Sequence, residues 1–285
     1  MSIQGSQAAA LRWDLSGFGD EIDDDPRVQA AVMRALGASH IEVRSAWGTN
    51  IVDLSEEQLA ALKGVLDEAG LNVSAIASPI GKVDVELPVE HEVERLGRAL
   101  RAAEVLGAPY IRIFSFFYEG KAPEQVRDAV IERMTALARR AEGTGVTLVH
   151  ENEKDIFGDI PSRVADIVTS VDSPALKLAW DPANFVQVGV KPFTDGYELL
   201  RPHVVYLQVK DALFADGSVV PAGEGDGEVL RTVEALRDSG YTGFASLEPH
   251  LAEAFSLGGF SGPYAFGVAA RAFAKVLEAA GVEAG

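Results

Sequence analysis

Residues 146–181, VTLVHENEKDIFGDIPSRVADIVTSVDSPALKLAWD, decide the fold class. Two short, mainly apolar runs, Val146–Glu151 and Leu176–Asp181, flank a longer stretch in which Pro161 opens a helix. A strand, a helical crossover and a second strand form the repeating unit of a parallel sheet. This stretch therefore predicts an α/β protein.

The same unit recurs along the whole chain. In most units a glycine such as Gly70 or Gly107 stands a few residues before the next strand, where it ends a helix. Eight strands are predicted: Trp13–Phe18, His40–Arg44, Asn72–Ser78, Tyr110–Phe116, Val146–Glu151, Leu176–Asp181, Val204–Val209 and Phe244–Glu248. At about 30 residues per unit, they predict a single (β/α)8 TIM barrel over residues 11–285, with a flexible tail over residues 1–10. An open doubly wound sheet is the alternative, but no dinucleotide-binding glycine fingerprint follows the first strand.

The composition narrows the class of partner. The formal net charge is -18, which disfavours nucleic acids and anionic membrane surfaces because both need a cationic face. The chain has no cysteine, so disulfides, thiolate nucleophiles and sulfur metal ligands are excluded. No secretory signal is recognisable and no apolar run approaches the ~18 residues needed to span a bilayer. We expect a soluble, cytoplasmic protein with a small-molecule partner.

Four consecutive predicted strands, the fifth to the eighth, end in polar residues. Glu151, Asp181 and Glu248 end three of them, and Gln208 lies near the end of the fourth. In a barrel the ends of parallel strands meet at one mouth, and neighbouring strands lie about 4.8 Å apart. A single carboxylate at such a place is usually a helix cap or a solvated loop residue. Three carboxylates close together repel one another unless they take up protons or bind a cation. Together with Gln208 they therefore predict a divalent metal site.

These residues carry a family resemblance that covers essentially the whole chain. It rests on the following segments: HENEK (150–154), WDPANF (180–185), QVKDA (208–212), LEPH (247–250), GFGDEI (17–22) and IEVR (41–44). The chain resembles the xylose-isomerase-like TIM barrel superfamily, which holds sugar phosphate isomerases/epimerases, ketose 3-epimerases, inosose dehydratase and endonuclease IV. The resemblance implies a metal held by Glu151, Asp181, Gln208 and Glu248.

The chain departs from the family at two of these positions. Gln208 replaces the usual histidine ligand, and an all-oxygen set favours Mg²⁺ or Mn²⁺ over Zn²⁺. Asn184 stands where the epimerases place a substrate-contacting histidine, and we expect it to bind a sugar hydroxyl. The family mechanism implies that Glu151 and Glu248 act as acid–base partners on opposite faces of the substrate, through a metal-stabilised enediolate.

Further substrate-binding residues are expected around this mouth. Lys210 points to the same side of its strand as Gln208, where it contacts either the substrate or one of the crowded carboxylates. Lys154 follows Glu151, and His250 follows Glu248. The aromatic residues that would form an apolar wall are Trp47, Phe116 and Phe185.

Three remaining features have less direct interpretations. Glu42 and Arg112, charged residues inside apolar runs, are interpreted as a buried ion pair. Residues 221–227, PAGEGDG, offer backbone N–H groups to a phosphate, but Glu224 and Asp226 argue against an anion there. Ala252–Gly262, rich in Gly and Ser, is predicted to be a mobile lid.

The sequence thus favours a metal-dependent isomerase or epimerase in carbohydrate metabolism, acting on a neutral sugar, a cyclitol or a related keto-polyol. A lyase like inosose dehydratase and a non-catalytic sugar-binding barrel are the alternatives. An enzyme of the endonuclease IV type is disfavoured, because it needs a histidine-rich metal cluster and a basic surface, and the chain has five histidines and a charge of -18. Related barrels often form dimers or tetramers, so a homo-oligomer is a further expectation.

Overall fold

The computed structural model describes residues 12–251 and 261–285. The expected tail over residues 1–10 and residues 252–260 of the expected lid lie outside this part. Eight parallel strands form the barrel: β1 (Arg12–Gly17), β2 (His40–Val43), β5 (Asn72–Ala77), β6 (Tyr110–Ile113), β7 (Thr147–Glu151), β8 (Leu176–Trp180), β9 (Val204–Val209) and β12 (Phe244–Leu247). The predicted fold class and all eight predicted strands are confirmed.

The strands follow one another in a ring. The hydrogen-bonded order is β13-β1-β12-β9-β8-β7-β6-β5-β2. A parallel bridge between Phe18, which follows β1, and Glu42 of β2 closes the ring. Five further short strands among the described residues are not barrel strands: β3 (Ser45–Ala46), β4 (Thr49–Asn50), β10 (Asp211–Ala212), β11 (Val219–Val220) and β13 (Glu283–Ala284), of which β13 pairs with β1.

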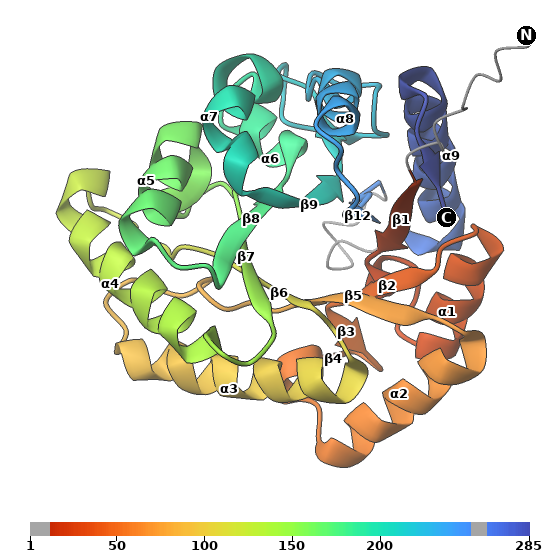
Figure 1. Ribbon diagram of the computed structural model, residues 1–285, viewed down its shortest axis with the longest axis horizontal. Coiled ribbons are helices and arrows are strands. Elements are labelled where there is room, and N and C mark those ends of the chain that lie inside the picture. Colours follow the sequence, from red (N-terminus) through yellow and green to blue (C-terminus); the bar gives the residue numbers. More distant parts are fainter. Residues whose placement is uncertain (1–11, 252–260) are drawn as a thin grey trace, which may run out of the picture.

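Helices surround the strands on the outside (Figure 1). The longer ones are α1 (Pro26–Ala35), α2 (Glu56–Ala69), α3 (Val89–Leu106), α4 (Pro123–Ala141), α5 (Pro161–Val171), α8 (Val229–Asp238) and α9 (Gly262–Ala280). The shorter turns are η1 (Gly19–Glu21), η2 (Ile51–Asp53), η3 (Phe157–Asp159), α6 (Pro182–Gln187), η4 (Pro192–Tyr197), α7 (Glu198–Leu200) and η5 (Arg201–His203). Within residues 12–251 and 261–285, none of the helices combines the length and the hydrophobicity that a membrane-spanning helix needs.

Local sequence explains where these helices begin and end. Ser55 and Gln58 form a reciprocal capping box at the start of α2, and Gly70 ends that helix in the left-handed conformation, with φ of 66°. Pro123 and Pro161 occupy the first turns of α4 and α5, as predicted.

One strand is shorter than predicted. β6 ends at Ile113, because the backbone of residues 114–117 leaves the sheet and donates hydrogen bonds to Ile80, Gly81 and Val83 in the loop after β5. This crossing requires glycine at position 81, where φ is +84° and a Cβ would lie 2.2 Å from the carbonyl oxygen of Phe114. The loop after β5 is thereby held beside the carboxyl ends of the strands.

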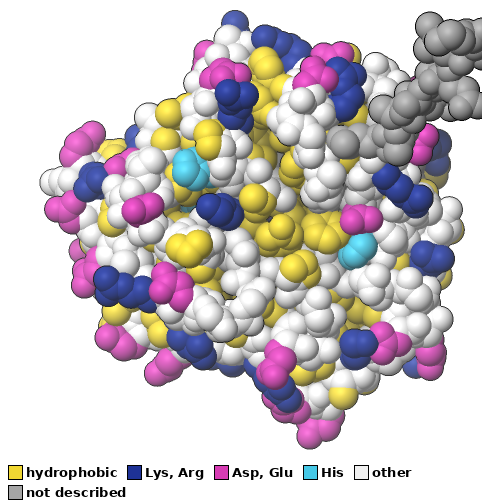
Figure 2. Space-filling model, viewed as in Figure 1, with side chains coloured by type: hydrophobic (Ala, Val, Ile, Leu, Met, Phe, Trp, Pro, Cys, Tyr) yellow, Lys and Arg dark blue, Asp and Glu magenta, His cyan; other side chains and the backbone are white. Residues whose placement is uncertain are grey.

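The barrel interior is filled in layers. Tyr110, Tyr206 and Phe244 pack with ring centroids 5.6 to 6.0 Å apart. Above them, Glu42 accepts hydrogen bonds from Tyr206 (2.8 Å) and Ser246 (2.6 Å). In the view of Figure 2, hydrophobic side chains gather at the centre over the strands and charged ones at the rim. The polar layer lies directly below the strand ends that carry the site.

Candidate active site at the barrel mouth

Three of the four predicted metal ligands converge at the strand ends. Glu151 ends β7, Asp181 follows β8 and Glu248 follows β12. Each offers a carboxylate oxygen within 4.8 Å of those of the other two, and all three residues are at most 3% exposed. Burial of three carboxylates this close demands compensating positive charge or protonation.

Three basic side chains supply part of that charge. Arg112 donates a hydrogen bond of 2.8 Å to Glu151 Oε2, and Arg44 donates one of 2.8 Å to Glu248 Oε1. Lys210 Nζ donates to Glu248 Oε2 at 2.9 Å and lies 2.8 Å from Asp181 Oδ2. The contact with Asp181 is an ion pair without hydrogen-bond geometry.

The pKa shifts follow from burial and from these pairs. Burial raises the pKa of Asp181 to about 7, against the opposing effect of Lys210. Burial also raises the pKa of Glu151, although Arg112 opposes the rise. For Glu248 burial acts upwards too, but Lys210, His250, Arg44 and Arg112 together hold its pKa well below the usual range.

This arrangement corrects one prediction about charged residues and adds a residue that was not predicted. The predicted ion pair between Glu42 and Arg112 is wrong, because the Arg112 guanidinium extends to Glu151 and Glu42 takes hydroxyl donors instead. Arg44, together with its other partners Asp20 (2.8 Å) and Glu21 (2.9 Å), was not predicted as part of the site. The signal was present, since these residues lie in the segments 17–22 and 41–44 that carry the family resemblance.

Gln208 lies on β9 in register with Ser246 of β12. Its Nε2 donates to Glu42 Oε1 at 3.5 Å, while its Oε1 is buried without a hydrogen-bond partner. Burial raises the pKa of Glu42 to about 7. A buried acceptor without a donor is costly unless another group, such as a cation, interacts with it.

Asn184 contacts Glu151. Its Nδ2 donates to Glu151 Oε1 (3.0 Å) and to the carbonyl of Asn152 (2.9 Å), and its backbone N–H donates to Asp181 Oδ1 (2.9 Å). The last bond caps α6, so Asp181 is both a helix cap and a member of the cluster. The expected contact of Asn184 with substrate competes with these bonds.

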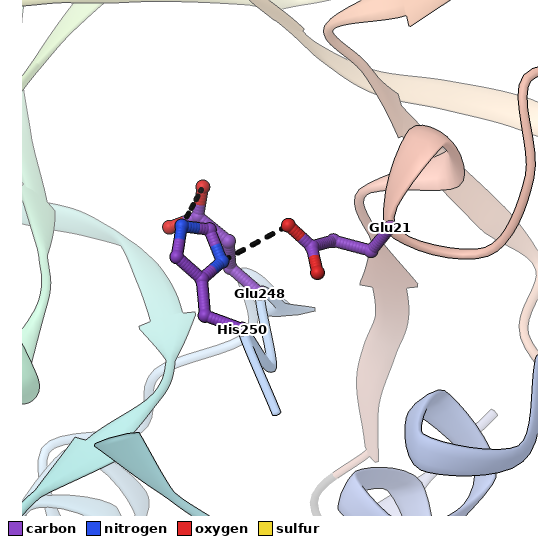
Figure 3. Close-up of side chains that lie close together, drawn as sticks. All are labelled: Glu21, Glu248 and His250. Carbon is purple, nitrogen blue, oxygen red and sulfur yellow. Dashed lines mark ion pairs between the residues drawn. The ribbon is translucent and has the colours of Figure 1, made fainter. Parts of the chain in front are cut away.

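His250 bridges two carboxylates (Figure 3). Its Nδ1 lies 2.9 Å from Glu21 Oε1 and its Nε2 lies 3.9 Å from Glu248 Oε1. The backbone of His250 is left-handed, with φ of 46°, an uncommon conformation for a residue other than glycine. His150, by contrast, is fully buried away from this cluster beside Gly158, and burial lowers its pKa to about 3.

A cavity of about 150 Å³ opens above the cluster. It is lined by Arg44, Asn50, Ala77, Pro79, Lys82, Arg112, Phe114, Glu151, Glu153, Lys210, Glu248 and His250. Its size suits a small molecule rather than a polymer.

The other predicted contact residues lie outside the lining of this cavity. Lys154 lines a separate cavity of about 680 Å³ with Tyr118 and Lys121. Trp47 is 37% exposed, and Phe116 is buried in the core. Phe185 packs on Trp180, with ring centroids 5.2 Å apart. Phe114, which was not singled out from the sequence, is the aromatic residue in the lining.

The three glycines of segment 221–227 do not present free N–H groups. The backbone N–H groups of Gly223, Gly225 and Gly227 donate to the carboxylate of Asp211 at 2.8 to 3.1 Å. The sequence argued against a phosphate at this segment because of the negative charges of Glu224 and Asp226. In the structure the carboxylate of Asp211 occupies the N–H groups that a phosphate would need.

The residues present fit a divalent metal. Apart from the pair of Lys82 with Glu153, six buried carboxylates of the described chain lie in or directly beside the mouth, against three cations: Asp20, Glu21, Glu42, Glu151, Asp181 and Glu248, facing Arg44, Arg112 and Lys210. The oxygen donors and the unpartnered Oε1 of Gln208 are those that Mg²⁺ and Mn²⁺ prefer. Glu151, Asp181, Glu248 and Gln208 are the residues that would hold such an ion.

Comparison with known proteins identifies relatives. A 2-epi-5-epi-valiolone 7-phosphate 2-epimerase from Actinoplanes sp. is 32% identical over 185 residues, which cover 62% of this chain and 64% of that protein. A solved structure of a D-tagatose 3-epimerase-like protein has a TM-score of 0.76 at 16% identity, covering 94% of this chain and 98% of that one.

A second solved structure, an IOLI protein with a bound zinc atom, has a TM-score of 0.76 at 17% identity and covers 93% of this chain and 98% of its own. At this level of identity the two structures show the fold alone. The model of the family described as xylose isomerase-like TIM barrel matches residues 30–263. The chain therefore belongs to the xylose isomerase-like TIM barrel family.

Proposed function

We propose that the protein is a divalent-metal-dependent isomerase or epimerase of a neutral, sugar-like keto-polyol. The observation that carries the proposal is the placement of Glu151 and Glu248. They come from β7 and β12, which are separated by β8 and β9, and both line the same small cavity. Two carboxylates on either side of Asp181 are suited to move a proton off one face of a carbon and onto the other.

The chain's own residues organise this transfer. Asn184 and Arg112 each hold one oxygen of Glu151, and Arg44 holds one oxygen of Glu248, so both carboxylates have fixed orientations. A bound Mg²⁺ or Mn²⁺ would polarise the substrate carbonyl and acidify the adjacent C–H bond. One glutamate removes that proton, and the other returns a proton on the opposite face.

The substrate class follows from the lining and from the relatives. The relative from Actinoplanes sp. is named as a 2-epimerase of 2-epi-5-epi-valiolone 7-phosphate. In the present chain the N–H groups of Gly223, Gly225 and Gly227 are taken by Asp211, which supports a substrate without phosphate at that loop. Polar and charged lining residues suit a molecule with several hydroxyl groups.

Proton exchange with solvent tests the proposal. Purified protein with Mn²⁺ in D₂O is incubated with a panel of ketoses and inososes, and deuterium at the carbon-bound position is measured by NMR. We expect exchange in the wild type and a loss of roughly 100-fold or more in Glu151→Gln and in Glu248→Gln. Glu68→Gln, an exposed residue of α2, is the matched control. Full exchange in both active-site variants contradicts the proposal, and loss of water from the substrate instead would identify a lyase.

A further inference from the structure

Lys210 contacts those carboxylate oxygens of Asp181 and Glu248 that are free for a metal. Asp181 Oδ1 accepts the N–H that caps α6, which leaves Oδ2, and Lys210 Nζ lies 2.8 Å from Oδ2. Glu248 Oε1 accepts a hydrogen bond from Arg44, which leaves Oε2, and Lys210 Nζ donates to Oε2 at 2.9 Å.

The ammonium group is buried where it stands. Lys210 is 5% exposed and bridges carboxylates that follow two different strands, β8 and β12. A divalent ion bound to the same two oxygens would lie a few ångströms from this charge, and the repulsion between them is strong in a site shielded from water. The ammonium and the metal cannot both bind these atoms.

The backbone at Lys210 is fixed, whereas its side chain has four rotatable bonds. The next residue, Asp211, accepts hydrogen bonds from Ala212, Gly223, Gly225 and Gly227 and is fully buried. Any adjustment to an incoming ion must therefore come from the Lys210 side chain.

We propose that Lys210 is a built-in counter-ion that competes with the divalent metal for Asp181 and Glu248, so that the metal binds only by displacing an ammonium group. The inference rests on the proposed function, because it takes the metal site as given. Lys210 lowers the affinity for the metal and, without metal, keeps the carboxylates close together in a folded protein.

Metal affinity tests this inference without reference to catalysis. Protein freed of metal with a chelator is titrated with Mn²⁺, and free Mn²⁺ is followed by EPR. Lys210→Met removes the charge at similar length and is expected to bind Mn²⁺ about tenfold more tightly, or better, than the wild type. Lys210→Arg keeps the charge and is expected to bind Mn²⁺ as weakly as the wild type, and Lys63→Met, at a lysine of α2 that pairs with Asp67, is expected to match the wild type.

Loss of the ammonium group leaves two buried carboxylates facing each other, so the fold of Lys210→Met is checked by thermal unfolding. Lys210→Gln, which keeps a hydrogen-bond donor, is measured beside it. If the folded variant, Lys210→Met or Lys210→Gln, binds Mn²⁺ no more tightly than the wild type, the proposed competition is wrong. It is also wrong if neither variant binds Mn²⁺. Proton exchange by the wild type at saturating Mn²⁺ is measured separately. If the wild type shows no exchange, the proposed function is contradicted, but the competition between Lys210 and the metal is not.

Discussion

Asn184 holds Glu151 in place through its side-chain amide, which also bonds the carbonyl of Asn152. The side chain is 2% exposed, so its two donors are used within the protein. We interpret it as a positioning residue for Glu151 rather than as a substrate contact.

Asn184→Leu is expected to lower kcat by roughly tenfold to 100-fold with little change in KM, because Glu151 keeps its chemistry but loses its orientation. Gln187→Leu, on the same helix but bonded to Gly217, is the control. Steady-state kinetics on the substrate identified by exchange separate the outcomes. An increase in KM at constant kcat would show that Asn184 binds substrate instead.

At the scale of elements, the loop between β10 and α8 is organised around one carboxylate. The carboxylate of Asp211 accepts hydrogen bonds from four backbone N–H groups, those of Ala212, Gly223, Gly225 and Gly227. A Cβ at Gly225 or at Gly227 would lie 2.5 Å from Asp211 Oδ1. The loop therefore folds around Asp211 as an anion nest does around a phosphate.

Asp211→Ala is expected to lower the free energy of unfolding by about 2 to 4 kcal/mol, since it leaves buried N–H groups without acceptors. Asp216→Ala, which removes a single exposed bond to Ser218, should change it by less than about 0.5 kcal/mol. Denaturant unfolding measures both, and hydrogen exchange at residues 221–227 localises the effect. Similar losses in the two variants would show that Asp211 does not anchor the loop.

The pair between α4 and α5 predicts a pH dependence. Arg127 donates two hydrogen bonds to Asp166, at 2.7 and 2.6 Å, and these bonds lower the pKa of Asp166. The pKa of Asp166 is lower in the folded protein than in the unfolded chain. The ionised carboxylate therefore stabilises the fold at a pH above its pKa in the unfolded chain. This stabilisation is lost as the pH falls through its pKa in the folded protein.

Asp166→Asn is therefore expected to be less stable than the wild type by about 0.5 to 1 kcal/mol at neutral pH, because the pair is partly exposed. The difference should shrink below about pH 4. Asp128→Asn, at a carboxylate that is 97% exposed, is the control. A difference for Asp166→Asn that stays constant from pH 7 to pH 3 would contradict this assignment.

For the molecule as a whole, the sequence was sufficient to predict the barrel fold and the residues at which most of its strands end. Strand periodicity and helix-ending glycines located seven strands to within one residue at each end. β6 was predicted too long, because residues 114–117 are apolar like a strand but pair with a loop distant in sequence. Three carboxylates at neighbouring strand ends were predictable because parallel strands deliver their ends to one mouth.

The partners of those carboxylates were not predictable from the sequence. Strand alternation places Arg112 in the barrel, but whether it reaches Glu42 or Glu151 depends on the stagger between strands and on hydroxyl donors from Tyr206 and Ser246. Likewise, segment 221–227 has the composition of an anion-binding loop, and only the three-dimensional structure shows that Asp211 is the anion.

Anomalous diffraction from a crystal soaked in Mn²⁺ will show whether the carboxylates at the mouth hold a divalent metal. We expect a manganese peak within coordination distance of Glu151, Asp181 and Glu248 and close to Gln208 Oε1, with the Lys210 ammonium moved away from Asp181. A peak between Glu21, Glu248 and His250 instead, or no peak at the mouth at saturating Mn²⁺, would contradict it.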